Sequence, residues 1–156
     1  MPERKPSGDH NNSINTLSFE SCINYLLTNA QRRTHAVFSK GLEEFNVTPG
    51  QSAVLEILWT CGDQTPSFLA SQLKLELPTL SGVLDKLQKK GFINRIINQE
   101  NQRTIIVSLT EAGKLLEDPI KERVAILNNK LLKGINDTDR ELLFNILNYI
   151  SSFKDE

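Results

Sequence analysis

The chain has 156 residues, of which 38% are apolar and 24% charged, a composition typical of a water-soluble globular protein with one hydrophobic core. No apolar run approaches the ~20 residues needed to cross a bilayer, and the N-terminus lacks the apolar core of a secretion signal. We therefore expect a cytoplasmic protein without membrane contact. Taken over the whole chain, the net charge of -1 argues against a nucleic-acid binder.

The charge is unevenly distributed along the chain. Residues 72–104 contain six basic and three acidic side chains, a net charge of +3 that leaves -4 for the remainder. Because phosphate attraction acts within about one Debye length, ~10 Å, a local basic region can bind DNA on an acidic protein. The basic residues of this region are Lys74, Lys86, Lys89, Lys90, Arg95 and Arg103.

The first third of the chain predicts a polar arm followed by two helices. Residues 1–13 are polar and contain Pro, Gly and Asn, which predicts a disordered arm. Apolar residues recur every three or four positions over residues 17–44, which predicts a long helix. The sequence TPGQ at 48–51 is a capping-box signal with proline at the first helical position, and its helix should end near residue 61.

Two short helix signals and a hairpin signal follow. Thr65-Pro66 starts a helix through about residue 73, and Pro78 starts another that should end at Gly91, a residue suited to a left-handed cap. Residues 92–97 and 104–109 predict strands joined by the polar turn 98–102. A helix-turn-helix with a β-ribbon can contact a DNA groove with one element and the flanking backbone with the other.

The C-terminal third predicts two helices. Thr110 should start a long helix to about residue 132, and Pro119 inside it should cause a kink or a boundary. A second capping-box signal, Thr138 followed by Glu141, should start a last helix that reaches about residue 153. That helix is apolar around more than one face, which indicates two burial partners: its own subunit and a second copy of the chain.

The stretches FLASQLKLELPTLSGVLDKLQKKGFINR and ENQRTIIVSLTEAGKLL resemble the MarR family of bacterial transcriptional regulators, and the resemblance covers the chain apart from its arm. It implies a mainly α fold with a small β-hairpin wing. Residues 48–109 would form a winged helix-turn-helix, and residues 14–47 and 110–156 would form dimerisation helices of the same single domain. The partners implied are double-stranded DNA with a palindromic operator and a second copy of the chain.

The recognition helix and the wing supply the candidate DNA-binding residues. Thr79 and Ser81 can bond base edges or phosphates, although both residues also suit a helix cap or a solvated surface. Lys86 suits a phosphate or a guanine, whereas Lys89 and Lys90 fit a solvated helix end that favours the helix dipole. The full set of candidates is Ser67, Pro78, Thr79, Ser81, Gly82, Lys86, Arg95, Gln102 and Arg103.

The wing tip departs from the family pattern. The resemblance implies Asp-x-Arg at the tip, where the acid holds the arginine for the minor groove, but this chain has Asn101-Gln102-Arg103. Asn101 offers only a neutral hydrogen bond, so the tether is expected to be weaker unless Glu100 replaces it. Arg103 is expected to enter an A·T-rich minor groove.

The resemblance further implies a repressor that is released by a small aromatic or phenolic effector, such as an aromatic acid or its thioester. Arg33 lies on the apolar stripe of the first helix and could receive a carboxylate, or its stem could pack while the guanidinium reaches solvent. Trp59 is the second candidate for the effector site, although it also suits the core.

Cys22 and Cys61 predict neither a zinc site nor a disulfide; we expect two small buried side chains, and no metal or other cofactor. Cys22, near the start of the first helix, leaves an oxidant-sensing regulator as an alternative. The chain lacks a nucleophile-base pair and a phosphate-binding glycine loop, so we expect no enzyme. A winged-helix protein-interaction module without DNA binding is the remaining alternative.

Overall fold

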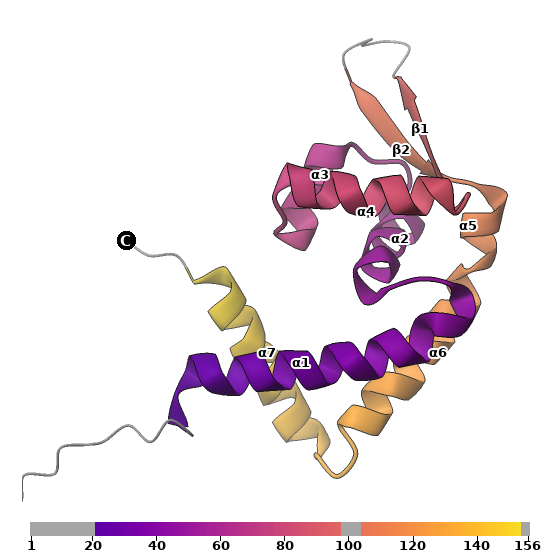
Figure 1. The fold of residues 1–156 in the computed structure, drawn as a ribbon. Coiled ribbons are helices and arrows are strands. Elements are labelled where there is room, and N and C mark those ends of the chain that lie inside the picture. The colour runs from indigo at the N-terminus through magenta and orange to yellow at the C-terminus, as the bar shows by residue number, and fades with distance from the viewer. Residues whose placement is uncertain (1–20, 98–103, 154–156) are drawn as a thin grey trace, which may run out of the picture. The chain divides into compact units, whose positions relative to one another are not determined.

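The structure, a computed structural model, describes residues 21–97 and 104–153. The chain divides after Arg33 into two compact units, and the described part of the first unit is the N-terminal portion of one helix. The described residues are mainly helical with one two-stranded antiparallel hairpin, which confirms the predicted fold class (Figure 1). The helices are α1 (Ile23–Leu42), the 3-10 helix η2 (Glu43–Phe45), α2 (Pro49–Cys61), α3 (Pro66–Leu73), α4 (Leu77–Lys89), α5 (Glu111–Leu115), α6 (Glu117–Leu131) and α7 (Asp137–Ser152), and the strands are β1 (Ile93–Ile97) and β2 (Ile105–Leu109).

Helices α2 and α3 begin at the residues that the sequence predicts. The Thr48 hydroxyl accepts a hydrogen bond from the Gln51 backbone N–H at 3.3 Å, and the Gln51 side-chain oxygen accepts one from the Thr48 N–H at 3.1 Å. This reciprocal pair satisfies two donors that the helix leaves open. At the start of α3, the Thr65 hydroxyl accepts from the Phe68 N–H at 3.2 Å.

The core of the second unit lies between the winged helix-turn-helix elements. Leu80, Leu84 and Leu87 form the buried face of α4, at the three- and four-residue spacing that places side chains on one side of a helix. The other buried apolar residues come from the end of α1, the segment before α2, and from α2, α3, β1, β2 and α6: Leu42, Val47, Val54, Leu55, Leu58, Leu69, Ala70, Ile93, Val107, Ile120 and Leu127.

Strands β1 and β2 pair in an antiparallel register, and their buried side chains belong to the same core. Ile93 lies opposite Leu109 and Ile97 lies opposite Ile105, and Gln64 forms an isolated bridge with Val107 on the other side of β2. Helix α4 ends before Gly91, whose φ of 76° turns the chain into β1, as expected for a glycine cap.

The helix predicted from Thr110 to residue 132 is divided, in agreement with the kink or boundary predicted at Pro119. The chain forms two helices, α5 and α6, with a break at Leu116. Pro119 explains the break, because a proline has no N–H to donate to Leu115 and its ring would clash with that carbonyl. In the first turn of α6 the missing N–H costs nothing, since that donor has no partner within the helix.

The prediction that Thr138 caps the last helix is wrong. Asn136 is the cap: its side-chain oxygen accepts a hydrogen bond from the Asp139 N–H at 2.9 Å, and Thr138 lies inside the first turn. The turn before α7 is further held by Arg140, which donates to the carbonyls of Ile135 at 2.9 Å and Leu132 at 3.0 Å.

We expect Asn136→Ala to lower the free energy of unfolding by about 1 kcal/mol, because the substitution removes the cap of α7. Thr138→Ala is the matched control and should change stability by less than about 0.5 kcal/mol, as for an exposed position without a capping bond. Urea denaturation followed by circular dichroism measures both. Equal losses for the two variants would contradict the assignment of the cap.

Candidate nucleic-acid interface

The N-terminal half of α4 presents a row of small side chains. Pro78, Thr79, Ser81 and Gly82 are all exposed, because Leu80 between them is fully buried and fixes the rotation of the helix. Glu76 is the N-cap and makes no side-chain capping bond. Within the described residues neither hydroxyl of this row is engaged in a cap, so both are free to bond an external partner.

Gly82 leaves open space at the surface of this row. A Cβ built on it would meet no atom within 4 Å, so packing inside the subunit does not require glycine there. An absent side chain on an exposed helix face allows another backbone to approach closely. Ser67, the second residue of α3, is also exposed, near a helix N-terminus that suits a phosphate.

Several basic residues of the region 72–104 are engaged inside the protein. Lys90 is half-buried and donates to the carbonyl of Asn46 at 2.6 Å and to the side-chain oxygen of Gln51 at 2.8 Å. The expectation that Lys90 is a solvated helix end is therefore wrong. Lys74 donates to the carbonyl of Ser151 at 2.6 Å.

Among the basic residues of this region, Arg95 has the environment that differs most from the one expected from the sequence. Its guanidinium donates to the Asp85 carboxylate, so the arginine joins β1 to α4. The side chain is only 20% exposed, and its Nε is buried without a hydrogen-bond partner in the described part of the chain. A DNA contact by Arg95 stays a prediction, but the geometry gives the residue a role in positioning the wing against the recognition helix.

Lys86 and Lys89 remain exposed and, within the described residues, have no ion pair or hydrogen bond. They are therefore the available cations on α4. The wing-tip candidates Gln102 and Arg103, together with Asn101, lie outside the described residues.

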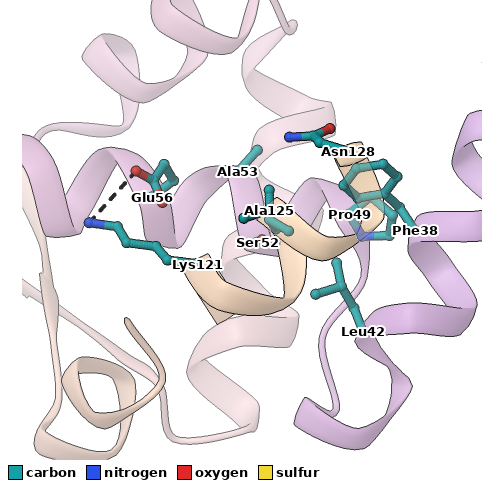
Figure 2. A pocket seen from close by; sticks show the side chains of 10 residues that line it. Phe38, Leu42, Pro49, Ser52, Ala53, Glu56, Lys121, Ala125 and Asn128 are labelled. Atoms are coloured by element: carbon teal, nitrogen blue, oxygen red, sulfur yellow. Dashed lines mark ion pairs between the residues drawn. The ribbon is translucent and has the colours of Figure 1, made fainter. Parts of the chain in front are cut away.

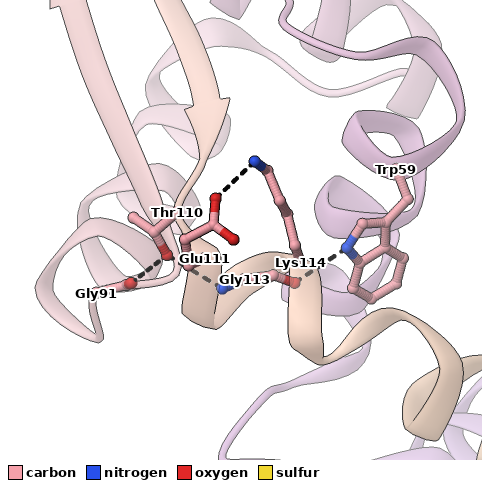
Figure 3. A network of polar contacts seen from close by, with 6 residues as sticks. All are labelled: Trp59, Gly91, Thr110, Glu111, Gly113 and Lys114. Atoms are coloured by element: carbon pink, nitrogen blue, oxygen red, sulfur yellow. Dashed lines mark hydrogen bonds and ion pairs between the residues drawn. The ribbon is translucent and has the colours of Figure 1, made fainter.

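A polar network ties the base of the wing to α5 (Figure 3). The Thr110 hydroxyl donates to the Gly91 carbonyl at 2.6 Å and accepts from the Gly113 N–H at 3.0 Å. The indole N–H of Trp59 donates to the Gly113 carbonyl at 3.0 Å. Each of these buried or half-buried groups has a partner, so the network holds the end of α4, the wing and α5 in one arrangement.

Residues 47–105 match the model of the MarR family. The regulator FarR of Neisseria gonorrhoeae is 30% identical to this chain over 109 residues, which cover 70% of the chain and 75% of FarR. The chain belongs to the MarR family. The organic hydroperoxide resistance transcriptional regulator of Bacillus subtilis is 29% identical, over 69% of this chain and 73% of that protein. The structure of the transcriptional repressor CouR bound to a 23-mer DNA duplex superposes with a TM-score of 0.79 and 25% identity, covering 85% of this chain and 94% of CouR.

This MarR-family chain is a DNA-binding transcriptional regulator with a winged helix-turn-helix. The matched proteins are named as transcriptional regulators, which fits the expectation of a protein that is not an enzyme. Among the helices of residues 21–97 and 104–153, none is long and apolar enough to span a membrane. The same residues contain no cluster of His, Cys, Asp and Glu that could hold a metal ion.

This member of the MarR family also has a largely apolar cavity of about 400 Å³ between the C-terminal part of α1, α2 and α6 (Figure 2). The sequence-based effector candidates do not line it. Trp59 lies beside a different cavity and uses its N–H in the network described above, and Arg33 is exposed in the N-terminal unit. The lining residues are Phe38, Leu42, Pro49, Ser52, Ala53, Glu56, Lys121, Val124, Ala125 and Asn128.

The family resemblance implies an effector pocket between the first helix, the helix carrying Trp59 and the helix after Thr110, and the cavity lies in this region. Its lining residues were not predicted, because they come from three separated segments. The available signal was weak: small residues at 52, 53 and 125 fall on two different helices that the sequence does not pair.

The prediction that both cysteines are buried is wrong for Cys61, which is exposed at the last residue of α2, while Cys22 is partly exposed; both are free thiols.

Proposed function

We propose that the protein is a homodimeric repressor that binds a palindromic operator and is released from it by a small ligand. The observation that carries the proposal is the exposed row of small polar residues on α4, with Lys86 one turn beyond it. Each α4 would enter the major groove of one operator half, with Thr79 and Ser81 at base edges and Lys86 at phosphate. Arg103 would reach the adjacent minor groove. The likeness to CouR, a transcriptional repressor bound to a DNA duplex, supports DNA binding by a repressor of this fold.

The C-terminal helix supports the dimer. No residue of α7 is buried, and five of its large apolar side chains are 39–69% exposed. A helix with this much exposed apolar surface is expected to be covered by another chain. The exposed residues are Leu142, Phe144, Ile146, Leu147 and Tyr149. We accordingly propose residues 14–47 and 110–156 as the dimerisation segments, residues 48–109 as the winged helix-turn-helix, and residues 1–13 as an arm outside it.

A double substitution tests the dimer and the operator contact together. We expect Phe144→Glu with Leu147→Glu to yield a monomer in light scattering, because two carboxylates would have to be buried at the interface. Operator affinity should fall more than about 100-fold. A monomer binds one operator half with a single winged helix-turn-helix, without the effective concentration that a linked second copy supplies. Fluorescence anisotropy with an operator duplex measures the affinity.

The control for this test is Asn145→Glu, which adds a carboxylate to the exposed stripe formed by Glu141, Asn145 and Asn148 on the same helix. It should leave both the dimer and the affinity unchanged. A double variant that remains dimeric would contradict the proposed interface, and a monomer with undiminished affinity would contradict binding by two heads.

The cavity between α1, α2 and α6 is the proposed effector site, in place of Arg33 and Trp59. One side of its lining belongs to α2 of the winged helix-turn-helix, and the other side belongs to α6, which precedes α7 in the chain. The residues are Pro49, Ser52 and Ala53 on α2 and Val124 and Ala125 on α6. A ligand in this cavity would change the distance between α2 and α6. It would thereby change the spacing of the two recognition helices and their fit to the operator.

A second candidate function is oxidant sensing. It is favoured by the similarity to the Bacillus subtilis regulator named for organic hydroperoxide resistance and by the free, partly exposed thiol of Cys22. If this function holds, mild peroxide should abolish operator binding by the wild type and not by Cys22→Ser, with oxidation at Cys22 in the mass spectrum. Equal binding before and after oxidation would exclude it.

A further inference from the structure

The cavity between α1, α2 and α6 has its charged side chains at one end. Figure 2 shows Glu56 and Lys121 together at one end, with Phe38 and Pro49 at the other. The charged side chains that line the cavity are therefore one carboxylate and one ammonium. Their immediate surroundings decide which charge a ligand can bring into this space.

Lys121 is already engaged by carboxylates. Its Nζ lies 2.7 Å from a Glu117 oxygen, one turn earlier on α6, and 3.9 Å from a Glu56 oxygen. The hydrogen bond that Lys121 donates to Glu117 raises the pKa of Lys121, and the charges of Glu56, Glu117 and Asp118 raise it further. Three acidic side chains thus compensate one ammonium, and of these three Glu56 lines the cavity.

Glu56 retains capacity for another partner. At 3.9 Å its contact with Lys121 is too long for a hydrogen bond, and its side chain is 51% exposed. A carboxylate can accept several hydrogen bonds, and in the described residues Lys121 is its one ion-pair partner. Ser52, one turn before Glu56 on α2 and only 8% exposed, adds a hydroxyl to the same lining.

We infer that this cavity selects an apolar ligand carrying one positive charge, with the cation against Glu56 and the apolar body against Phe38, Leu42 and Val124, and that it disfavours carboxylates. The inference rests on the proposed role of the cavity as the effector site. It differs from the aromatic acid implied by the family resemblance. A carboxylate would meet Glu56, and the one cation of the lining, Lys121, is already paired with Glu117. An ammonium, in contrast, gains Glu56 without displacing the Lys121–Glu117 pair.

Three probes that share one apolar skeleton and differ in charge test this inference: 2-naphthylmethylammonium, 2-naphthamide and 2-naphthoate. Isothermal titration calorimetry of the full-length chain at neutral pH measures each affinity. The ammonium should bind about tenfold more tightly than the carboxylate, with the amide between them, as expected for exchanging attraction for repulsion at a half-exposed acid. Tighter binding of the carboxylate or of the amide than of the ammonium would overturn the inference, as would binding of none of the three.

Substitution of Glu56 locates the effect. Glu56→Gln should weaken binding of the ammonium about fivefold and leave the amide within about twofold, because only the charge contact is lost. Glu122→Gln is the matched control: it removes an exposed acid of α6 that does not line the cavity, and it should preserve the order of the probes. An unchanged preference in Glu56→Gln would overturn the assignment.

The proposed release from DNA is measured separately by adding each bound probe to the protein–operator complex. Ammonium binding at the cavity without any change in operator affinity would leave the charge selectivity intact and contradict the effector function. A carboxylate that binds better and releases the operator would support the effector function and contradict the charge selectivity.

Discussion

Replacing Ser81 by glutamate is expected to lower operator affinity by 100-fold or more without altering the fold. Ser81 is exposed in the N-terminal half of α4, between the buried Leu80 and the exposed Gly82, so the new side chain meets no core atom. In the proposed complex the carboxylate would lie in the major groove close to phosphates. It would remove a hydrogen bond worth about 1 kcal/mol and add charge repulsion.

Fluorescence anisotropy at fixed salt measures this loss, and thermal unfolding checks the fold. Ser81→Ala separates the two contributions: removal of the hydroxyl alone should weaken binding by about 5- to 10-fold, a cost of about 1 kcal/mol. Asn145→Glu, which adds the same charge on α7, serves again as the control and should bind as the wild type does. If Ser81→Glu binds the operator with wild-type affinity, α4 does not contact the DNA.

Gly113→Ala is expected to be the most destabilising single methyl addition in the described part of the protein. A Cβ at Gly113 would lie 2.1 Å from the backbone oxygen of Phe92 and 3.2 Å from Leu109 Cδ2. The close atom is a main-chain carbonyl at the base of the wing, so α5 and β1 must move apart. The bonds of Gly113 to Thr110 and Trp59 would be strained with them. We expect a loss of about 3 kcal/mol or more.

Urea denaturation monitored by circular dichroism measures this loss. Gly50→Ala is the matched control, because a Cβ there meets no atom within 4 Å and Gly50 lies in the first turn of α2. That substitution should leave stability equal or raise it by up to about 1 kcal/mol. A variant Gly113→Ala as stable as the wild type would contradict the close contact between α5 and Phe92, the residue before β1.

Helix boundaries that depend on neighbouring residues were predicted from the sequence. The start of α2 follows from Thr48 and Gln51, and the end of α4 follows from Gly91, because each signal acts within a few residues of the boundary. The cap of α7 was misassigned because Asn136 and Thr138 both have the side chain of a cap. Only the position of the preceding turn decides between them.

The parts of the site that depend on tertiary contacts were not predicted. The composition counts Lys90 and Arg95 among the bases available to DNA, but the fold brings Gln51 and Asp85 to them from other segments. The residues that line the cavity were missed for the same reason, since no local pattern pairs Ser52 on α2 with Ala125 on α6. The exposure of Thr79 and Ser81, in contrast, follows from the helical spacing of the leucines around them.

The most direct test of the account is in vitro selection of duplexes from a random DNA library by the full-length protein, followed by a salt titration of the selected site. A homodimer that reads DNA with two copies of α4 should select a two-fold symmetric sequence whose half-sites are about one helical turn apart, with affinity that falls steeply as salt rises. Enrichment of an asymmetric single site, or of no sequence at all, would contradict a dimer that reads a palindrome with two copies of α4.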